Sequence, residues 1–188
     1  MIQNGSVDRI AMVGVVGNLM LWALGHDIGE GNRDFIRRSL GEAFEETWQD
    51  SEKLVSEYQS LLFLPSDLAV EEDGTRKTIG LDDLPTNFPI YDIGIDTMMR
   101  LRPLIMEANC LLWNGPASYF EKSEFAYGTV EIMNMFTEAT GVTIVGGGHT
   151  SALFNQRGKA DQVSHNSTGG GSVPVSYTHL TLPTNSNV

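Results

Sequence analysis

Apolar residues along this chain fall into short runs that alternate with segments of helical periodicity. The runs rich in β-branched and aromatic residues favour strands at residues 8–13, 61–64, 88–93, 110–113, 143–145 and 163–165. The most regular helical segment covers residues 29–58, where apolar side chains recur every four positions from Ile36 to Trp48. Strands that alternate with helices predict an α/β fold. We expect a three-layer, Rossmann-like domain with a mainly parallel sheet and helices on both faces.

The segment between residues 64 and 88 departs from this alternation. Two short apolar runs flank Asp73-Gly74, a pair that favours a tight hairpin turn. We therefore expect a small β-hairpin at the surface, with little chemistry in it.

The stretch at residues 143–153 combines a strand, a glycine turn and a helix start. Three β-branched residues precede a triple-glycine turn at residues 146–148, and Thr150 or Ser151 can cap the helix that follows. Unpaired N–H groups and the partial positive charge of a helix N-terminus make such a turn a good seat for phosphate. A tight turn without a ligand is the alternative, and this turn alone does not decide between the two.

Glycine-rich turns also follow other predicted strands, at residues 14–18, 92–97, 114–121 and 166–172. The carboxyl ends of parallel strands lie at one edge of the sheet, and ligands bind outside that edge. The convergence of several turns predicts a binding site more strongly than any one of them.

Composition narrows the class of ligand. The 24 acidic residues against 12 basic ones give a net charge of -12, which argues against general binding to nucleic acid or to a membrane surface. Backbone amides can still bind phosphate in an acidic protein. Cys110 is the only cysteine and no apolar run is long enough to span a bilayer, so we expect a cytoplasmic protein.

Several of these turns together resemble phosphoglycerate kinase, and in particular its C-terminal, nucleotide-binding half. The matching segments, in the family's order, are the Asn-Gly-Pro bend and its continuation at residues 114–121, Gly128-Thr129, the triple-glycine turn with its flanks at residues 145–150, and the Ser-His-Asn-Ser-Thr-Gly-Gly-Gly run at residues 164–171. Residues 25–29 and 89–94 look like the archaeal branch. The resemblance covers residues 1–172, which we expect to form one incomplete nucleotide-binding domain.

The resemblance implies a monomeric transferase of glycolysis and gluconeogenesis. Its reaction moves a phosphoryl group between 1,3-bisphosphoglycerate and ADP, giving 3-phosphoglycerate and ATP, with Mg²⁺. Positioning and charge neutralisation matter most for such a loose transition state. Carried over by position, the implied site residues are Gly14, Tyr91 and Tyr119 at the adenine, Asn114 and Pro116 near the ribose and phosphates, Glu121 at the ribose hydroxyls, Gly146, Gly147, Gly148, His149 and Thr150 at the phosphates, and Gly148, Gly170 and Gly171 as catalytic glycines near the transferring group.

The chain also departs from the family pattern. His149 stands where Asp is common, and because neutral His is a poor magnesium ligand we assign no protein ligand to the metal. Ser118 replaces the second glycine of the bend motif. The family's N-terminal domain, which binds phosphoglycerate, and a Gly-Gly-x-Lys turn are absent from this sequence, so we expect the chain alone to be inactive. Residues 173–188 resemble a translated sequencing adapter, and we predict that they are a non-native tail.

Two other functions stay open. One is a stand-alone module that binds adenine nucleotides without turnover. The other is a different α/β enzyme that binds a dinucleotide, although the required Gly-x-Gly-x-x-Gly spacing is not met around Gly146.

Overall fold

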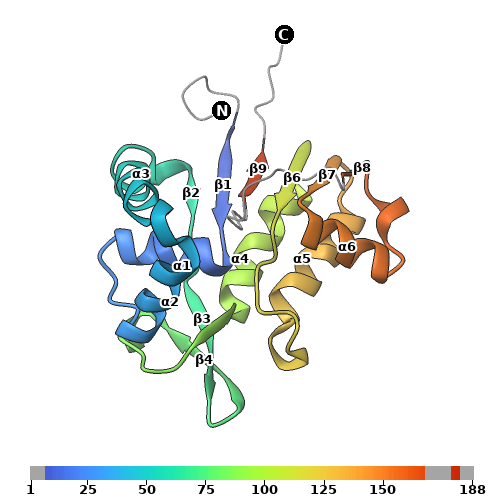
Figure 1. Cartoon of the computed structure of the whole chain (residues 1–188). Helices are drawn as coiled ribbons and strands as arrows, with labels where there is room; N and C mark the ends of the chain where they lie inside the picture. The colour runs from blue at the N-terminus through green and yellow to red at the C-terminus, as the bar shows by residue number, and fades with distance from the viewer. Residues whose placement is uncertain (1–6, 168–178, 183–188) are drawn as a thin grey trace.

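The computed structural model describes residues 7–167 and 179–182, and its strands and helices alternate as predicted (Figure 1). The main sheet has the order β2-β1-β9-β6-β7-β8. Its strands are β1 (Arg9–Met12), β2 (Leu62–Phe63), β6 (Cys110–Asn114), β7 (Val142–Gly146), β8 (His165–Asn166) and β9 (His179–Leu182). The pairs β1–β2, β6–β7 and β7–β8 are parallel, which confirms the predicted mainly parallel sheet.

Strand β9 runs antiparallel to both of its neighbours, β1 and β6. It belongs to the stretch at residues 173–188, which we predict to be a non-native tail, yet its backbone lies inside the sheet (Figure 1). The boundary between residues 172 and 173 stays a prediction.

A second, antiparallel sheet contains the predicted hairpin. It has the order β4-β3-β5, with β3 (Asp67–Glu72), β4 (Thr75–Gly80) and β5 (Ile90–Ile93). Asp73 and Gly74 both have positive φ, at 50° and 76°, as the tight hairpin turn requires. The expectation that β5 belongs to the parallel sheet is wrong, because β5 pairs antiparallel with β3 of the hairpin.

Six α-helices surround these sheets in the described residues. They are α1 (Gly14–Ala23), α2 (Glu30–Leu40), α3 (Phe44–Glu57), α4 (Ile95–Met106), α5 (Tyr127–Glu138) and α6 (Gly148–Gln156). Short 3-10 turns lie between the helices and after α6, namely η2 (Gly41–Ala43), η3 (Gln59–Leu61), η4 (Leu81–Asp83), η5 (Ser123–Phe125) and η6 (Ala160–Gln162). The helical segment predicted at residues 29–58 is interrupted at Gly41, whose φ of 54° ends α2.

The core lies on both faces of the main sheet. Ile10 and Met12 of β1 pack against α1 and α3, whereas the alternate residue Ala11 joins a larger cluster with α4 and α5. Trp113 of β6 is fully buried in that larger cluster, with Phe136 of α5 at a ring-centroid distance of 5.3 Å. Helices therefore cover both faces of the sheet, as the pattern predicts.

Candidate functional site

The Asn-Gly-Pro bend and the triple-glycine turn lie at the same end of the sheet. They follow β6 and β7, which are parallel, and Asn114 is the register partner of Gly146. Both turns therefore leave the carboxyl edge of the sheet side by side, where the sequence places a ligand.

One hydroxyl joins these two turns. Oγ1 of Thr150 accepts the backbone N–H of Gly115 at 2.9 Å, and Thr150 is buried. The prediction that Thr150 or Ser151 caps α6 is wrong, because the residue before α6 is Gly147 and α6 has no side-chain cap. Thr150 instead holds the Asn-Gly-Pro bend against the first turn of α6.

Gly147 needs to be glycine for two reasons. Its φ is 86°, in the left-handed region. A Cβ atom there would also collide with Oδ1 of Asn114. The backbone of the triple-glycine turn can approach Asn114 this closely only without a side chain.

A third turn reaches the same place from β1. Gly14 is the first residue of α1 and has φ of 63°. A Cβ on it would lie 3.0 Å from the carbonyl oxygen of Pro116 and 3.3 Å from that of Ala117. The structure thus brings Gly14, Pro116 and the triple-glycine turn together at one rim.

The start of α6 has the electrostatic character of an anion site. Its first turn contains no acidic residue, and Gly148 and His149 are exposed. A Cβ on Gly148 would meet no atom within 4 Å, so the space in front of this helix end is open. The N–H groups and the helix dipole can therefore reach an anion at this end.

Two tyrosines from distant segments lie against each other beside this rim. The rings of Tyr91 in β5 and Tyr119 are 5.1 Å apart between centroids, and the backbone N–H of Tyr119 donates to the carbonyl of Tyr91 at 2.7 Å. Phe125 packs its edge against Tyr91 at 5.2 Å. Tyr119 is 44% exposed, which leaves an aromatic surface for a flat ring to contact.

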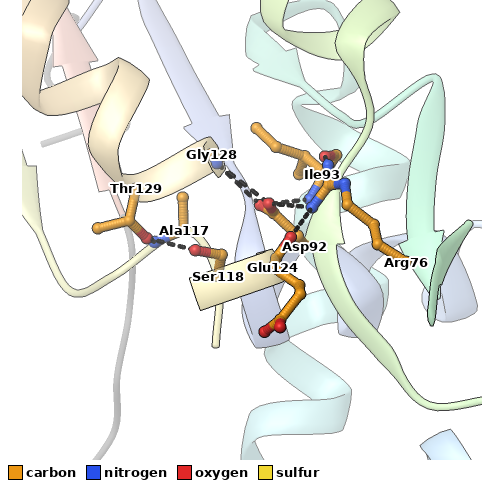
Figure 2. Close-up of polar contacts among 8 residues, drawn as sticks. All are labelled: Arg76, Asp92, Ile93, Ala117, Ser118, Glu124, Gly128 and Thr129. Atoms are coloured by element: carbon orange, nitrogen blue, oxygen red, sulfur yellow. Dashed lines mark hydrogen bonds and ion pairs between the residues drawn. The ribbon is translucent and has the colours of Figure 1, made fainter. Parts of the chain in front are cut away.

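The loop that carries Tyr119 is held by hydroxyl groups. The backbone N–H of Ala117 donates to Oγ1 of Thr129 at 3.1 Å, and the hydroxyls of Ser118 and Thr129 are 2.7 Å apart (Figure 2). Ser118, which departs from the family pattern, is therefore buried and hydrogen-bonded rather than strained.

Sequence reasoning missed the part that the hairpin takes in this region. Nζ of Lys122 lies 2.7 and 2.8 Å from the carboxylate oxygens of Glu71 in β3, and 5.0 Å from the ring centre of Tyr91. The hydrogen bond with Glu71 raises the pKa of Lys122. Glu71 and Lys122 are 51 residues apart, so no local pattern could have predicted this contact.

A buried carboxylate was missed as well. Asp92 accepts from Arg76 Nη1 at 2.6 Å, from the backbone N–H of Gly128 at 3.1 Å and from that of Ile93 at 2.8 Å (Figure 2). Burial raises the pKa of Asp92 to about 6, although these hydrogen bonds oppose the rise. An acidic residue at a strand end is common, and nothing near it in the sequence indicated a buried ion pair.

For the remaining predicted site residues the structure gives fewer contacts or none. Glu121 is exposed at the end of the Tyr119 loop. Gly170 and Gly171 lie outside the described residues, so their predicted role stays a prediction. In the part of the chain that the structure describes, no three His, Cys, Asp or Glu side chains gather where they could hold a metal ion. Nor does that part contain a helix of the length and apolarity that a bilayer crossing requires.

Glycine turns and a helix N-terminus that meet at the carboxyl edge of a parallel sheet define a phosphate- or nucleotide-binding α/β domain. The comparisons with known proteins agree with this class and narrow it. The family model for phosphoglycerate kinase matches residues 2–175, and the chain belongs to that family.

Relatives and solved structures carry the same family name. The chain is 36% identical over 170 residues to a phosphoglycerate kinase of Methanobacterium bryantii, and 35% identical over 176 residues to one of Thermoplasma volcanium. These alignments cover 90% and 94% of this chain. The crystal structure of phosphoglycerate kinase from Pyrococcus horikoshii OT3 matches 87% of the chain, with a TM-score of 0.77 and 31% identity. That from Coxiella burnetii also matches 87%, with a TM-score of 0.73 and 30% identity.

The chain spans well under half the length of these proteins. It covers 41% and 42% of the two relatives, and 40% and 41% of the two solved chains. The match is therefore to one part of a phosphoglycerate kinase.

Proposed function

We propose that this chain is the nucleotide-binding part of a phosphoglycerate kinase, which transfers a phosphoryl group between 1,3-bisphosphoglycerate and ADP. The observation that carries this proposal is the hydrogen bond between Thr150 and Gly115. It holds the Asn-Gly-Pro bend beside the open N-terminus of α6, so one nucleotide can contact both turns.

The nucleotide would lie along the rim that these turns form. Its phosphates would meet the N–H groups of Gly147, Gly148 and His149, because the helix dipole favours negative charge there. Its base would lie toward Tyr91 and Tyr119, whose rings form an aromatic surface. The family resemblance supports both placements, and it adds Glu121 at the ribose and Gly170 and Gly171 near the transferring group.

Magnesium would arrive with the nucleotide. Mg²⁺ prefers oxygen ligands and is often bound through nucleotide phosphates plus one or two carboxylates. His149 offers nitrogen where the family commonly has a carboxylate, and the first turn of α6 has no acidic residue. The chain's own part is therefore to hold the phosphates, while the metal neutralises their charge.

In this proposal, phosphoglycerate binds to the part of the kinase that this chain does not span. We therefore expect the chain alone to bind ADP and to form no ATP from added 1,3-bisphosphoglycerate. Steady ATP formation by the isolated chain would contradict that expectation. A module that only binds nucleotide remains the second candidate. Joining the chain to the remaining part of a related kinase separates the two, because only the first predicts restored turnover.

Titration calorimetry with ADP tests the binding site itself. In Gly148→Asp a carboxylate replaces open space at the α6 N-terminus, and we expect ADP affinity to fall at least tenfold through charge repulsion. Gly31→Asp is the matched control, since Gly31 lies in α2 with no atom within 4 Å of its Cβ position. Folded wild-type protein that does not bind ADP, or equal losses in both variants, would refute the proposal.

A further inference from the structure

The ion pair of Arg76 and Asp92 lies where the antiparallel sheet meets the start of α5 (Figure 2). Arg76 belongs to β4 and Asp92 to β5, and their side chains approach to 2.6 Å. The Asp92 side chain has no exposed surface, and that of Arg76 is 22% exposed. The pair is therefore more shielded from water than the other ion pairs of the described residues.

The start of α5 docks directly on this carboxylate. The N–H of Gly128 donates to both oxygens of Asp92, at 3.2 and 3.1 Å. A Cβ on Gly128 would collide with Oδ1 of Asp92, so only glycine allows the approach. This close contact therefore fixes the position of α5 relative to β5.

The same pair supports both tyrosines of the rim. Asp92 follows Tyr91, whose carbonyl accepts the N–H of Tyr119. Arg76 donates to the carbonyl of Glu124 at 3.4 Å and lies 5.8 Å from the ring centre of Phe125, which packs against Tyr91. One guanidinium group therefore touches the strand beneath Tyr91 and the segment that supports the Tyr119 loop.

We propose that Arg76 and Asp92 are positioning residues for the base-binding surface, because they hold Tyr91 and Tyr119 in the ring contact that forms this surface. Neither side chain contacts the nucleotide. This inference rests on the proposed function for the identity of the ligand, but the coupling it describes exists in the free protein. The hairpin is then part of the nucleotide site, not only a surface extension.

Because Asp92 can be protonated, the positioning of the two tyrosines should depend on pH. Besides Arg76, the titratable groups around Asp92 include Asp67 of β3, Glu124 of η5, and Tyr127 and Glu131 of α5. Burial raises the pKa of Tyr127, and Glu131, Asp92 and Asp67 raise it further, whereas Arg76 lowers it. The pKa of Asp92 is about 6, so its carboxylate is ionised at neutral pH and becomes protonated in mild acid. Protonation of Asp92 removes the charge from its bond with Arg76 and so weakens the contact between the two side chains.

Binding of adenosine is the sharper probe, because it has no phosphate that titrates in this pH range. We expect Arg76→Met to weaken adenosine binding about tenfold at neutral pH, and Arg76→Lys to restore part of the loss. The wild type should bind more weakly as pH falls from 7.5 to 5.5, and Asp92→Asn should lose that dependence. Arg102→Met is the control, since its pair with Glu138 is 52% exposed on both sides and should leave affinity within twofold.

An NMR titration of the free protein separates this inference from the proposed function. The amide resonances of Gly128 and Tyr119 should shift together with one midpoint near pH 6, with no nucleotide present. A shift at Gly128 without one at Tyr119 would overturn the coupling, as would a folded Arg76→Met variant that binds adenosine like the wild type. Should no nucleotide bind at all, the proposed function fails while the titration still decides the coupling.

Discussion

Asp67 of β3 caps a helix to which it does not belong. Its carboxylate accepts the backbone N–H groups of Asp96 and Thr97 at 3.0 and 2.8 Å, and the hydroxyl of Thr97 at 2.6 Å. The N–H of Asp67 donates in turn to Oγ1 of Thr97 at 3.1 Å, so each residue provides a hydrogen-bond partner for the other. This exchange joins the antiparallel sheet to α4, whose inner face packs in the main core.

Asp67→Ala should therefore destabilise the whole domain. Removing the carboxylate leaves the buried N–H of Thr97 and the partly buried N–H of Asp96 without this partner, which costs on the order of 2–4 kcal/mol. Urea unfolding followed by tryptophan fluorescence measures the loss. Asp83→Ala is the matched control, because Asp83 accepts the exposed N–H of Gly80, and this change should cost less than about 1 kcal/mol. Equal losses would contradict the special role of Asp67.

The triple-glycine turn makes a second prediction about stability. Gly147→Ala forces a side chain into a positive φ and against Asn114, so we expect a loss of roughly 2 kcal/mol or more. Gly148→Ala at the neighbouring position has open space and ordinary φ, and should leave the free energy of unfolding unchanged or slightly raised. Thermal unfolding of the two variants side by side measures the difference, and similar midpoints would count against the close approach.

The sequence was sufficient for the elements whose signals are local. Hydrophobic runs located the parallel strands, and Asp73-Gly74 located the hairpin turn, because each depends on residues a few positions apart. The rim could also be predicted, since the carboxyl ends of parallel strands must meet at one edge. Asn114 and Gly146 are register partners for that reason.

The contacts that tie separate elements together could not be predicted. The type and position of Thr150 predict a helix cap. Only the folded chain shows that its hydroxyl accepts the backbone N–H of Gly115 instead. Likewise the pair of Arg76 and Asp92 joins the predicted hairpin to β5, the strand whose sheet was wrongly predicted. Polar side chains bond to groups that lie near them in the folded chain, so the spacing of residues along the sequence does not predict these bonds.

Tyr119 allows a test of base binding that spares the fold. Because Tyr119 is 44% exposed and outside the core, Tyr119→Ala should cost no more than about 0.5–1.5 kcal/mol, which is the contribution of its ring contact with Tyr91. Loss of a stacking surface should weaken ADP and adenosine alike, by about 1–3 kcal/mol per base. Phe35→Ala in α2 removes a ring that is 52% exposed and should leave both affinities unchanged. Calorimetry that finds full affinity in Tyr119→Ala would exclude the tyrosine surface as the base site.

The raised pKa of Asp92 fixes the sign of a pH effect on stability. The folded chain holds this proton up to about pH 6, whereas the unfolded chain releases it near 3.8. Stability from this group is therefore present below pH 4 and falls as pH rises to 6, by on the order of 3 kcal/mol. A rise in pH therefore has opposite effects on the stability of the fold and on the positioning of the tyrosines. Ionised Asp92 is costly to bury, which lowers stability, but it binds Arg76 more strongly.

Asp92→Asn should remove that fall. Urea unfolding between pH 4 and 7 should show wild type losing stability relative to the variant as pH rises. Glu138→Gln, at an exposed pair, should give a curve parallel to that of the wild type. A parallel curve for Asp92→Asn as well would mean that Asp92 titrates normally in the folded state.

His149 decides how the chain handles a nucleotide-bound metal. An exposed imidazole at the start of α6 gives Mg²⁺ no oxygen ligand, so ADP should bind with a small preference for the magnesium complex. His149→Asp places a carboxylate at that point, and we expect the ratio of ADP dissociation constants without and with Mg²⁺ to rise about fivefold or more. His26→Asp makes the same chemical change beyond the far end of α1 and should leave the ratio unaltered. An unchanged ratio in His149→Asp would place the metal away from the α6 N-terminus, and the phosphates with it.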